Sequence, residues 1–315
     1  MESSEYPPYI CTLDEESQKK ALKELYEDPK NRQGAIDTFR EWIKQQKHMK
    51  CPMDNVFLLG FLRAKHFSQL EAREALERFM GNRERFPNWM KGIDTGSEDF
   101  LDIIKRGGGL ILPKRDRDNR KVFIAIRKIV PDKQSIERMC RFMAAISYNN
   151  YLCDEMDQVH GTVSIIDWTG HSMAKELRIP MDLKKNSMVI LQKTFPSRLK
   201  AIHQYNTGPV MDIIMNIVVP LLTETMKQRV HIHTNLESLY EYVDKDVLPR
   251  EYLPDDYDGP DAGTIDQVKD LLMAHYQKPE VRERIKYLSS DQFYIHTKEK
   301  DTDVPAASFR KLNVD

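Results

Sequence analysis

The chain has 315 residues, of which 40% are hydrophobic and 31% are charged, and its formal net charge is −1. This composition is that of an ordinary globular protein, long enough for one large domain and a smaller one. The near-neutral charge gives no overall attraction to nucleic acid or to an acidic membrane, so any basic site has to be a local patch.

The cysteines and the N-terminal sequence indicate a protein that is not secreted. The four cysteines are widely spaced without a CxxC pair, which argues against a disulfide framework and a structural zinc site. The start, MESSEYPPYI, lacks the basic and apolar regions of a signal peptide. No apolar window reaches the roughly 20 residues that span a bilayer. We therefore expect a cytoplasmic protein with no transmembrane segment and no nucleic-acid partner.

The first hundred residues read as helices only. Ser68 and Glu71 form the S-x-x-E capping box that begins one of these helices. The predicted helices cover residues 14–28, 32–46, 54–67 and 68–86. The sequence therefore predicts a small all-helical module, which we place at residues 10–95.

After the glycines at 107–109 the hydrophobic period changes to that of strands. Short β-type runs at 122–129, 162–168, 199–206 and 229–234 are separated by helical patterns at 133–155, 182–194 and 209–226. Strands that alternate with helices predict a mostly parallel sheet. We expect the α/β class, with a small sheet domain at residues 96–260 and with C-terminal helices and a polar tail at residues 261–315.

The run from residue 209 to residue 222 is almost wholly apolar and predicts a helix with two apolar faces. Asp212 and Asn216 form a narrow polar strip between these faces. A helix that is apolar on nearly all sides is usually buried in a core. The alternative is a lid that covers a hydrophobic ligand. The lid candidates are Val210, Met211, Ile213, Ile214, Ile217, Val218 and Leu221.

Three cations stand at the starts of two predicted parallel strands. Arg198 and Lys200 are two residues apart on an extended strand and therefore face the same way. Arg229 begins the next strand, so all three cations are expected at one edge of the sheet. Each is worth on the order of 1 kcal/mol against an anionic membrane surface. A solvated basic rim is the alternative interpretation.

Two other patterns have a chemical interpretation. The sequence GHSMA at 170–174 resembles the nucleophile elbow of a serine hydrolase, with Ser172 as nucleophile, but three residues separate its glycine from the strand. His231 and His233 share a face of a strand but make an incomplete metal site. We therefore expect no enzyme, no catalytic residue, no metal and no cofactor, and keep a hydrolase using Ser172 as a distant alternative.

The order of these segments resembles the CRAL-TRIO lipid-binding family over roughly residues 10–290. Within that family the chain is most similar to the branch of the alpha-tocopherol transfer protein and the cellular retinaldehyde-binding protein. The motifs that carry the resemblance are FLLGFLRAKHFSQLEAREAL, GGGLILPKRDRDNRKVFI, GTVSIIDWTGHS, LQKTFPSRLKAIHQYNTG, VVPLL, RVHIHTNLESL and LPREYLPDDYDGP. The segment from Leu191 to Asn206 is the most specific of them.

The resemblance implies a pocket floored by the sheet and closed by a mobile helix, here the run at 209–222. It also implies a basic cleft that binds phosphoinositide head groups, including phosphatidylinositol bisphosphate. Arg198, Lys200 and Arg229 match three cations of that cleft; the fourth falls on Thr225, and Lys227 is the candidate substitute. The candidate pocket residues are Phe142, Ile146, Tyr148, Tyr151, Ile165, Ile190 and Ile202, each of which also fits a plain core position.

The function implied is a cytoplasmic carrier that binds one hydrophobic molecule, tocopherol-, retinoid- or otherwise lipid-like, and exchanges it during transient contact with membranes. The alternative is a phosphoinositide-responsive adaptor that holds a structural lipid permanently. A carrier must exchange its ligand on the timescale of membrane contact, whereas an adaptor need not.

Overall fold

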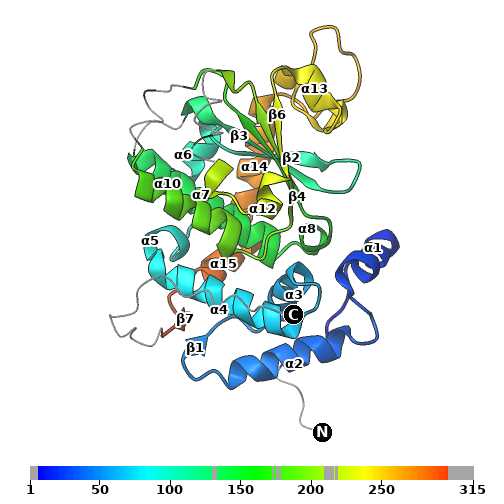
Figure 1. The fold of residues 1–315 in the computed structure, drawn as a ribbon, viewed down its shortest axis with the longest axis vertical. Helices are drawn as coiled ribbons and strands as arrows, with labels where there is room; N and C mark the ends of the chain where they lie inside the picture. Colours follow the sequence, from blue (N-terminus) through cyan, green and yellow to red (C-terminus); the bar gives the residue numbers. More distant parts are fainter. Residues whose placement is uncertain are drawn as a thin grey trace, which may run out of the picture.

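A five-stranded sheet with its surrounding helices forms one half of the molecule, and the N-terminal helices form the other half (Figure 1). The computed structural model describes residues 6–129, 133–171, 174, 179–208, 216 and 219–296. The mixed α/β class expected from the sequence is confirmed, with strands β3 to β6 parallel.

The first 105 residues contain the four predicted helices and two short additional ones, the second of which lies beyond the predicted module boundary at residue 95. They are α1 (Glu15–Leu25), α2 (Arg32–Lys44), α3 (Asn55–Ala64), α4 (Gln69–Arg85), α5 (Pro87–Met90) and α6 (Glu98–Lys105). Side-chain caps begin several of them, and Ser68 accepts the backbone N–H of Glu71 as predicted. The expectation of helices only is wrong at β1 (Met49–Lys50), which pairs with β7 (Tyr294–Ile295). Pairing between strands from opposite ends of the chain leaves no local signal in the sequence.

The sheet has the strand order β2, β3, β4, β5, β6. The strands are β2 (Leu110–Arg115), β3 (Lys121–Ile126), β4 (Thr162–Asp167), β5 (Leu199–Tyr205) and β6 (Val230–His233). Strands β3 to β6 correspond to the four β-type runs that the sequence predicts. The edge strand β2, antiparallel to β3, was not predicted because it contains Pro113 and lacks a clear alternation.

Helices and short turns connect the strands. They are η1 (Arg127–Ile129), α7 (Lys133–Leu152), α8 (Glu155–His160), α10 (Met181–Val189), the π-helix η2 (Ile190–Thr194), η5 (Val219–Leu221), α12 (Glu224–Lys227), α13 (Leu236–Tyr240), η6 (Lys245–Val247), η7 (Arg250–Tyr252), α14 (Ile265–Gln277) and α15 (Pro279–Leu288). The helix predicted over 133–155 ends earlier, because Asp154 caps a new helix by accepting the N–H of Asp157. The sequence pattern did not predict α15.

Two hydrophobic cores lie on opposite sides of the sheet. Val122, Val163 and Ile165 face one core, which the segments from α13 to α14 cover. Phe123 faces the other core, which α7 shares with the N-terminal helices and with α15. Because one core contains residues from both ends of the chain, packing joins the predicted modules, and their boundaries remain a prediction.

A buried ionic network fastens the N-terminal module to the sheet domain. Arg63 of α3 is fully buried, and its Nε and Nη2 donate to the carboxylate of Glu27 at 2.7 and 2.9 Å. Its Nη1 donates to Glu155 and to Gln158, both on α8 and both at 2.8 Å. A buried charge is tolerated when it is fully paired in this way. The network therefore fixes α8 relative to α3 and to the end of α1.

Gly161 connects α8 to β4 through a backbone conformation that other residues rarely adopt. Its φ is 83° and its ψ is −167°, a region that is essentially restricted to glycine. A Cβ at this position would lie 2.2 Å from the carbonyl oxygen of Arg198. That oxygen accepts the N–H of Thr162 at 3.0 Å, so the start of β4 lies directly against the start of β5.

We predict that Gly161→Ala lowers the free energy of unfolding by about 2 kcal/mol or more, because the φ cost and the backbone clash add. Urea unfolding followed by circular dichroism measures the change. Gly34→Ala is the matched control: nothing lies within 4 Å of the point that its Cβ would occupy and the residue is helical, so this change should raise stability by up to about 1 kcal/mol. Equal stability of the two variants would contradict the close approach at Gly161.

Candidate functional site

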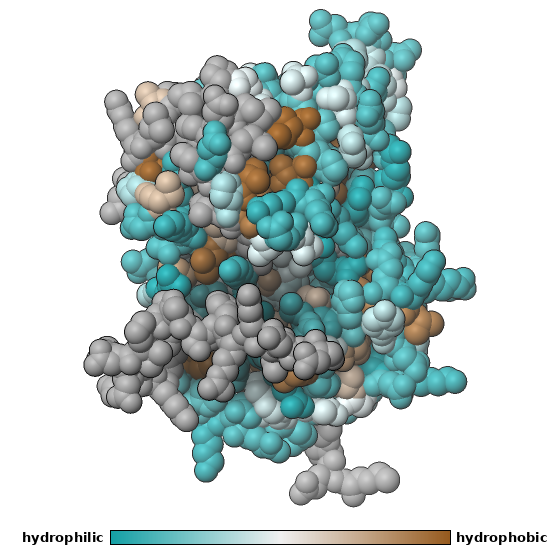
Figure 2. Space-filling view, in the orientation of Figure 1, coloured by the Kyte–Doolittle hydropathy of each residue, from teal (hydrophilic) through white to brown (hydrophobic). Residues whose placement is uncertain are grey.

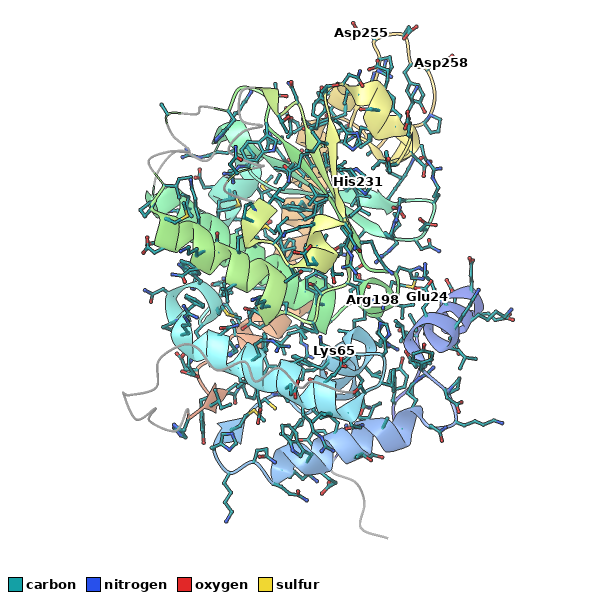
Figure 3. All side chains as sticks on the ribbon, in the orientation of Figure 1. Glu24, Lys65, Arg198, His231, Asp255 and Asp258 are labelled. Carbon is teal, nitrogen blue, oxygen red and sulfur yellow. The ribbon has the colours of Figure 1, made fainter. Side chains whose placement is uncertain are left out.

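The predicted cations meet at the edge of the sheet where β5 and β6 begin. Arg198 and Lys200 both contact one carboxylate oxygen, Oε2 of Glu24 on α1, at 3.2 and 3.6 Å. Arg198 and Glu24 are seen side by side in Figure 3. Nη1 of Arg229 donates to the carbonyl oxygen of Leu199 at 2.5 Å, which places Arg229 beside them. The three cations therefore lie together at this edge, and their role in binding phosphoinositide remains a prediction.

The cations of this basic cluster, Arg198, Lys200 and Arg229, are partly removed from water, and in the described part of the chain Arg198 and Lys200 share the carboxylate of Glu24. The side chain of Arg198 is 9% exposed, and among the described residues its buried Nε has no hydrogen-bond partner. Burial lowers the pKa of Arg198 and of Lys200, the adjoining cations lower them further, and Glu24 opposes the shift. Such a cluster has the charge and the free donor that bind an anion with several oxygens.

Lys227 lies on α12, where its Nζ contacts Glu224 of the same helix at 2.6 Å. Its participation in the basic cluster therefore remains a prediction. The sequence pattern also gave no indication of Glu24, which is 174 residues away from Arg198 along the chain.

Four of the seven candidate pocket residues lie in the core shared by the two halves of the molecule: Phe142, Ile146, Tyr148 and Ile190. Tyr148 is fully buried. Its hydroxyl accepts a hydrogen bond from Nη1 of Arg83 and donates one to the carbonyl oxygen of Met90 at 3.0 Å. Its ring packs edge-on against Phe79 and Phe195. These contacts account for Tyr148 as a structural residue. The hydroxyl of Tyr151 lies 3.1 Å from Oγ1 of Thr162.

Ile165 and Ile202 lie on opposite faces of the sheet, so they cannot line one pocket. In the β4–β5 register Ile165 is opposite His203, while Ile202 is opposite Ser164. Paired residues of neighbouring strands point to the same face, and successive residues alternate. Ile165 belongs to the core under α14. We therefore correct the candidate set by removing Ile165.

Ile202 belongs to an apolar group on the other face. It packs with Leu222 and Met226, and its partly buried neighbours are Ile166, Met188, Leu199 and Val230. Figure 2 shows hydrophobic atoms reaching the surface in the sheet half of the molecule. This apolar group is here called the Ile202 face; Ile202 is the candidate pocket residue that belongs to it, and its place in a ligand pocket remains a prediction.

The predicted lid residues Val210, Met211, Ile213, Ile214, Ile217 and Val218 lie outside the described residues, as does Ser172 of the hydrolase alternative. For Leu221 only the backbone is described, within η5. Both interpretations remain predictions.

His231 and His233 belong to a cluster of three histidines, because β5 contributes His203. Nδ1 of His203 and Nε2 of His233 are 2.9 Å apart, and the rings of His203 and His231 stack at 5.1 Å. Tyr242 covers the three rings. Within the described ranges no group of three or more His, Cys, Asp or Glu side chains is arranged to hold a metal ion. Burial, with smaller contributions from His233 and His231, lowers the pKa of His203 to about 3.

The fold is a mostly parallel sheet with apolar side chains packed on both faces and a basic cluster at the edge where β5 and β6 begin. Residues 105–252 match the CRAL/TRIO domain model, which confirms the resemblance to this family over that part of the chain. None of the helices in the described part of the chain is long and apolar enough to cross a membrane.

Curated relatives cover most of the chain. The alpha-tocopherol transfer protein-like protein of Mus musculus is 29% identical over 263 residues, which are 82% of this chain and 74% of that protein. The Homo sapiens protein of the same name is 29% identical over 83% of this chain and 75% of its own length. Clavesin-1 of Xenopus laevis is 26% identical over 76% and 73%. The solved structure of Sfh5 aligns with a TM-score of 0.48 at 17% identity, over 79% of this chain and 91% of that chain.

We predict that the histidine cluster makes the fold sensitive to acid. Free histidine has a pKa near 6.5, so between pH 6.5 and about 3 the unfolded chain binds a proton that folded His203 does not. The free energy of unfolding should therefore fall by roughly 1.4 kcal/mol per pH unit below pH 6.5 through this group alone. Unfolding in urea at pH 7 and pH 5 should show that His203→Gln loses about 2 kcal/mol less stability on acidification than the wild type.

His296 is exposed, so His296→Gln is the control for that experiment and should lose as much stability on acidification as the wild type. If His203→Gln and the wild type lose equal stability between pH 7 and pH 5, the buried neutral histidine is not the origin of the acid sensitivity.

Proposed function

We propose that this protein is a cytoplasmic, non-enzymatic carrier that binds one hydrophobic small molecule and exchanges it at membranes. The observation that carries the proposal is that one strand, β5, has the Ile202 face in its middle and the cations Arg198 and Lys200 at its start. An apolar ligand and an anionic head group would thus meet neighbouring parts of one rigid element. The match of residues 105–252 to the CRAL/TRIO domain model supports this function, as do relatives named alpha-tocopherol transfer protein-like.

The proposed ligand is tocopherol-, retinoid- or otherwise lipid-like. The Ile202 face consists of branched aliphatic and methionine side chains. Removing apolar surface from water is worth roughly 25 cal/mol per Å², so this face favours a ligand that is mostly hydrocarbon. Methionine adapts to irregular shapes, which suits exchange better than permanent packing. In this mechanism the segment at 209–222 covers the ligand and swings away at the membrane.

The proposed membrane contact is made by the basic cluster. Arg198, Lys200 and Arg229 would bind the phosphates of a phosphoinositide, with Lys227 as a further candidate on α12. Phosphate oxygens suit guanidinium donors because they accept two parallel hydrogen bonds. Binding at this edge would bring the neighbouring Ile202 face and the predicted lid to the bilayer surface.

We predict that the wild type, incubated with a lysate of its native tissue and repurified, yields one hydrophobic molecule in stoichiometric amount on mass spectrometry of an organic extract. Ile202→Trp should reduce this yield severalfold, because the larger side chain fills the Ile202 face. Leu271→Trp is the control: Leu271 lies 55% exposed on α14, and this variant should retain the ligand.

Circular dichroism first checks that both tryptophan variants are folded. A ligand-free wild type would contradict the carrier function. A ligand that does not exchange with added vesicles would indicate the adaptor instead.

We predict that Arg198→Ala/Lys200→Ala weakens binding to phosphatidylinositol bisphosphate vesicles about thirtyfold, since each of the two cations near an anionic surface contributes about 1 kcal/mol. Co-sedimentation with vesicles measures the affinity, and neutral phosphatidylcholine vesicles give the background. Lys105→Ala/Arg106→Ala, at the exposed end of α6, removes the same charge elsewhere. Equal binding of the two double variants would show that membrane contact does not use the basic cluster.

A further inference from the structure

We infer that the carboxylate of Glu24 occupies the anion position of the basic cluster and has to leave before a phosphorylated head group binds, so that α1 sets the affinity for anionic membranes. This inference rests on the proposed function, because it assumes that the basic cluster binds phosphate. It adds that Glu24, a residue of the N-terminal module, competes with the phosphate for the basic cluster.

The geometry around Glu24 is that of a shared and loosely held anion. Oε2 lies 3.2 Å from Nη2 of Arg198 and 3.6 Å from Nζ of Lys200, and Oε1 lies 4.0 Å from Nζ of Lys20. Strong charge-assisted hydrogen bonds are shorter, at about 2.7–2.9 Å. One carboxylate therefore touches three cations without an optimal bond to any of them.

The basic cluster offers more positive charge and more donors than one carboxylate uses. The positive charge of Arg229 lowers the pKa of both Arg198 and Lys200, and the charge of Lys20 also lowers the pKa of Lys200. The buried Nε of Arg198 has no acceptor among the described residues. A phosphate carries up to two negative charges and three acceptor oxygens. It can therefore satisfy the basic cluster better than Glu24 does.

Burial of Arg198 makes an exchange of anions more favourable than simple opening. If Glu24 left without a replacement, a guanidinium that is 9% exposed would lose its carboxylate partner. Leaving a buried charge unpaired is costly. Glu24 is therefore expected to stay in place in free solution and to be released when a head group arrives.

The movement required is that of the Glu24 side chain, because α1 is held on its other side. Ala21 and Leu25 are fully buried against Val159 of α8. Glu27, just after α1, is buried in its ion pairs with Arg63 and Arg32. Glu24 itself is 41% exposed and can turn outward. Replacing it should change anion affinity with little effect on the stability of the fold.

The test compares the wild type, Glu24→Gln and Glu24→Asp for binding to phosphatidylinositol bisphosphate vesicles, alone and combined with Arg198→Ala/Lys200→Ala. Removing the competitor should raise affinity about three- to tenfold. Glu24→Asp keeps the charge on α1 but withdraws the carboxylate by one methylene, so a gain in this variant too would assign the effect to contact. Both gains should vanish when Arg198 and Lys200 are alanine.

Glu16→Gln, an exposed change on the same helix, controls for net charge and should leave affinity unchanged. The soluble bisphosphate head group, measured by calorimetry, distinguishes the sources of phosphate. A gain in affinity for the soluble head group shows that phosphate contacts suffice, and a gain with vesicles alone assigns the exchange to the membrane-bound lipid.

If the Glu24 variants match the wild type while Arg198→Ala/Lys200→Ala loses binding, the inference that Glu24 competes with phosphate is wrong and the proposed membrane contact stands. If Arg198→Ala/Lys200→Ala also binds as the wild type, the proposed membrane contact itself fails.

Discussion

The buried charge of Arg63 is the interaction on which the arrangement of the site depends. Its guanidinium joins Glu27, at the end of α1, to Glu155 on α8. α8 leads through Gly161 to β4, where the N–H of Thr162 donates to the carbonyl oxygen of Arg198. The position of Glu24 on α1 and the position of Arg198 before β5 are thus set by one connected series of contacts. A buried ion that needs all of its partners gives such a series a defined geometry.

The two faces of the sheet are covered by different parts of the chain. The face that includes Val163 and Ile165 is closed by the segments from α13 to α14 and is an ordinary core. The Ile202 face is bordered by partly buried side chains from α10, β4 and β6. In the described part of the chain Leu222 and Met226 pack against Ile202, which makes this a smaller apolar group than the core on the opposite face.

The basic cluster follows from the same parallel topology. Parallel strands begin at one edge of a sheet, so residues that precede β5 and β6 come together whatever their separation in the sequence. Arg198 and Arg229 stand at these positions, and the alternation of β5 adds Lys200. The acceptor that completes the arrangement comes from α1, which links the helical module to the chemistry of the sheet edge.

The sequence by itself determined the local elements and the basic edge, because helix caps, hydrophobic periods and parallel strand starts are written in short stretches of residues. Ser68 and Glu71 marked a helix start, and Arg198 and Lys200 marked a shared strand face. Only the tertiary structure decided which faces and partners meet. A register irregularity between Thr162 and Val163 helps fix the face of Ile165 relative to Ile202. The pairing of β1 with β7, the contact of His203 with His233 and that of Glu24 with Arg198 each join distant segments. Such contacts depend on how whole elements pack, and no local pattern encodes them.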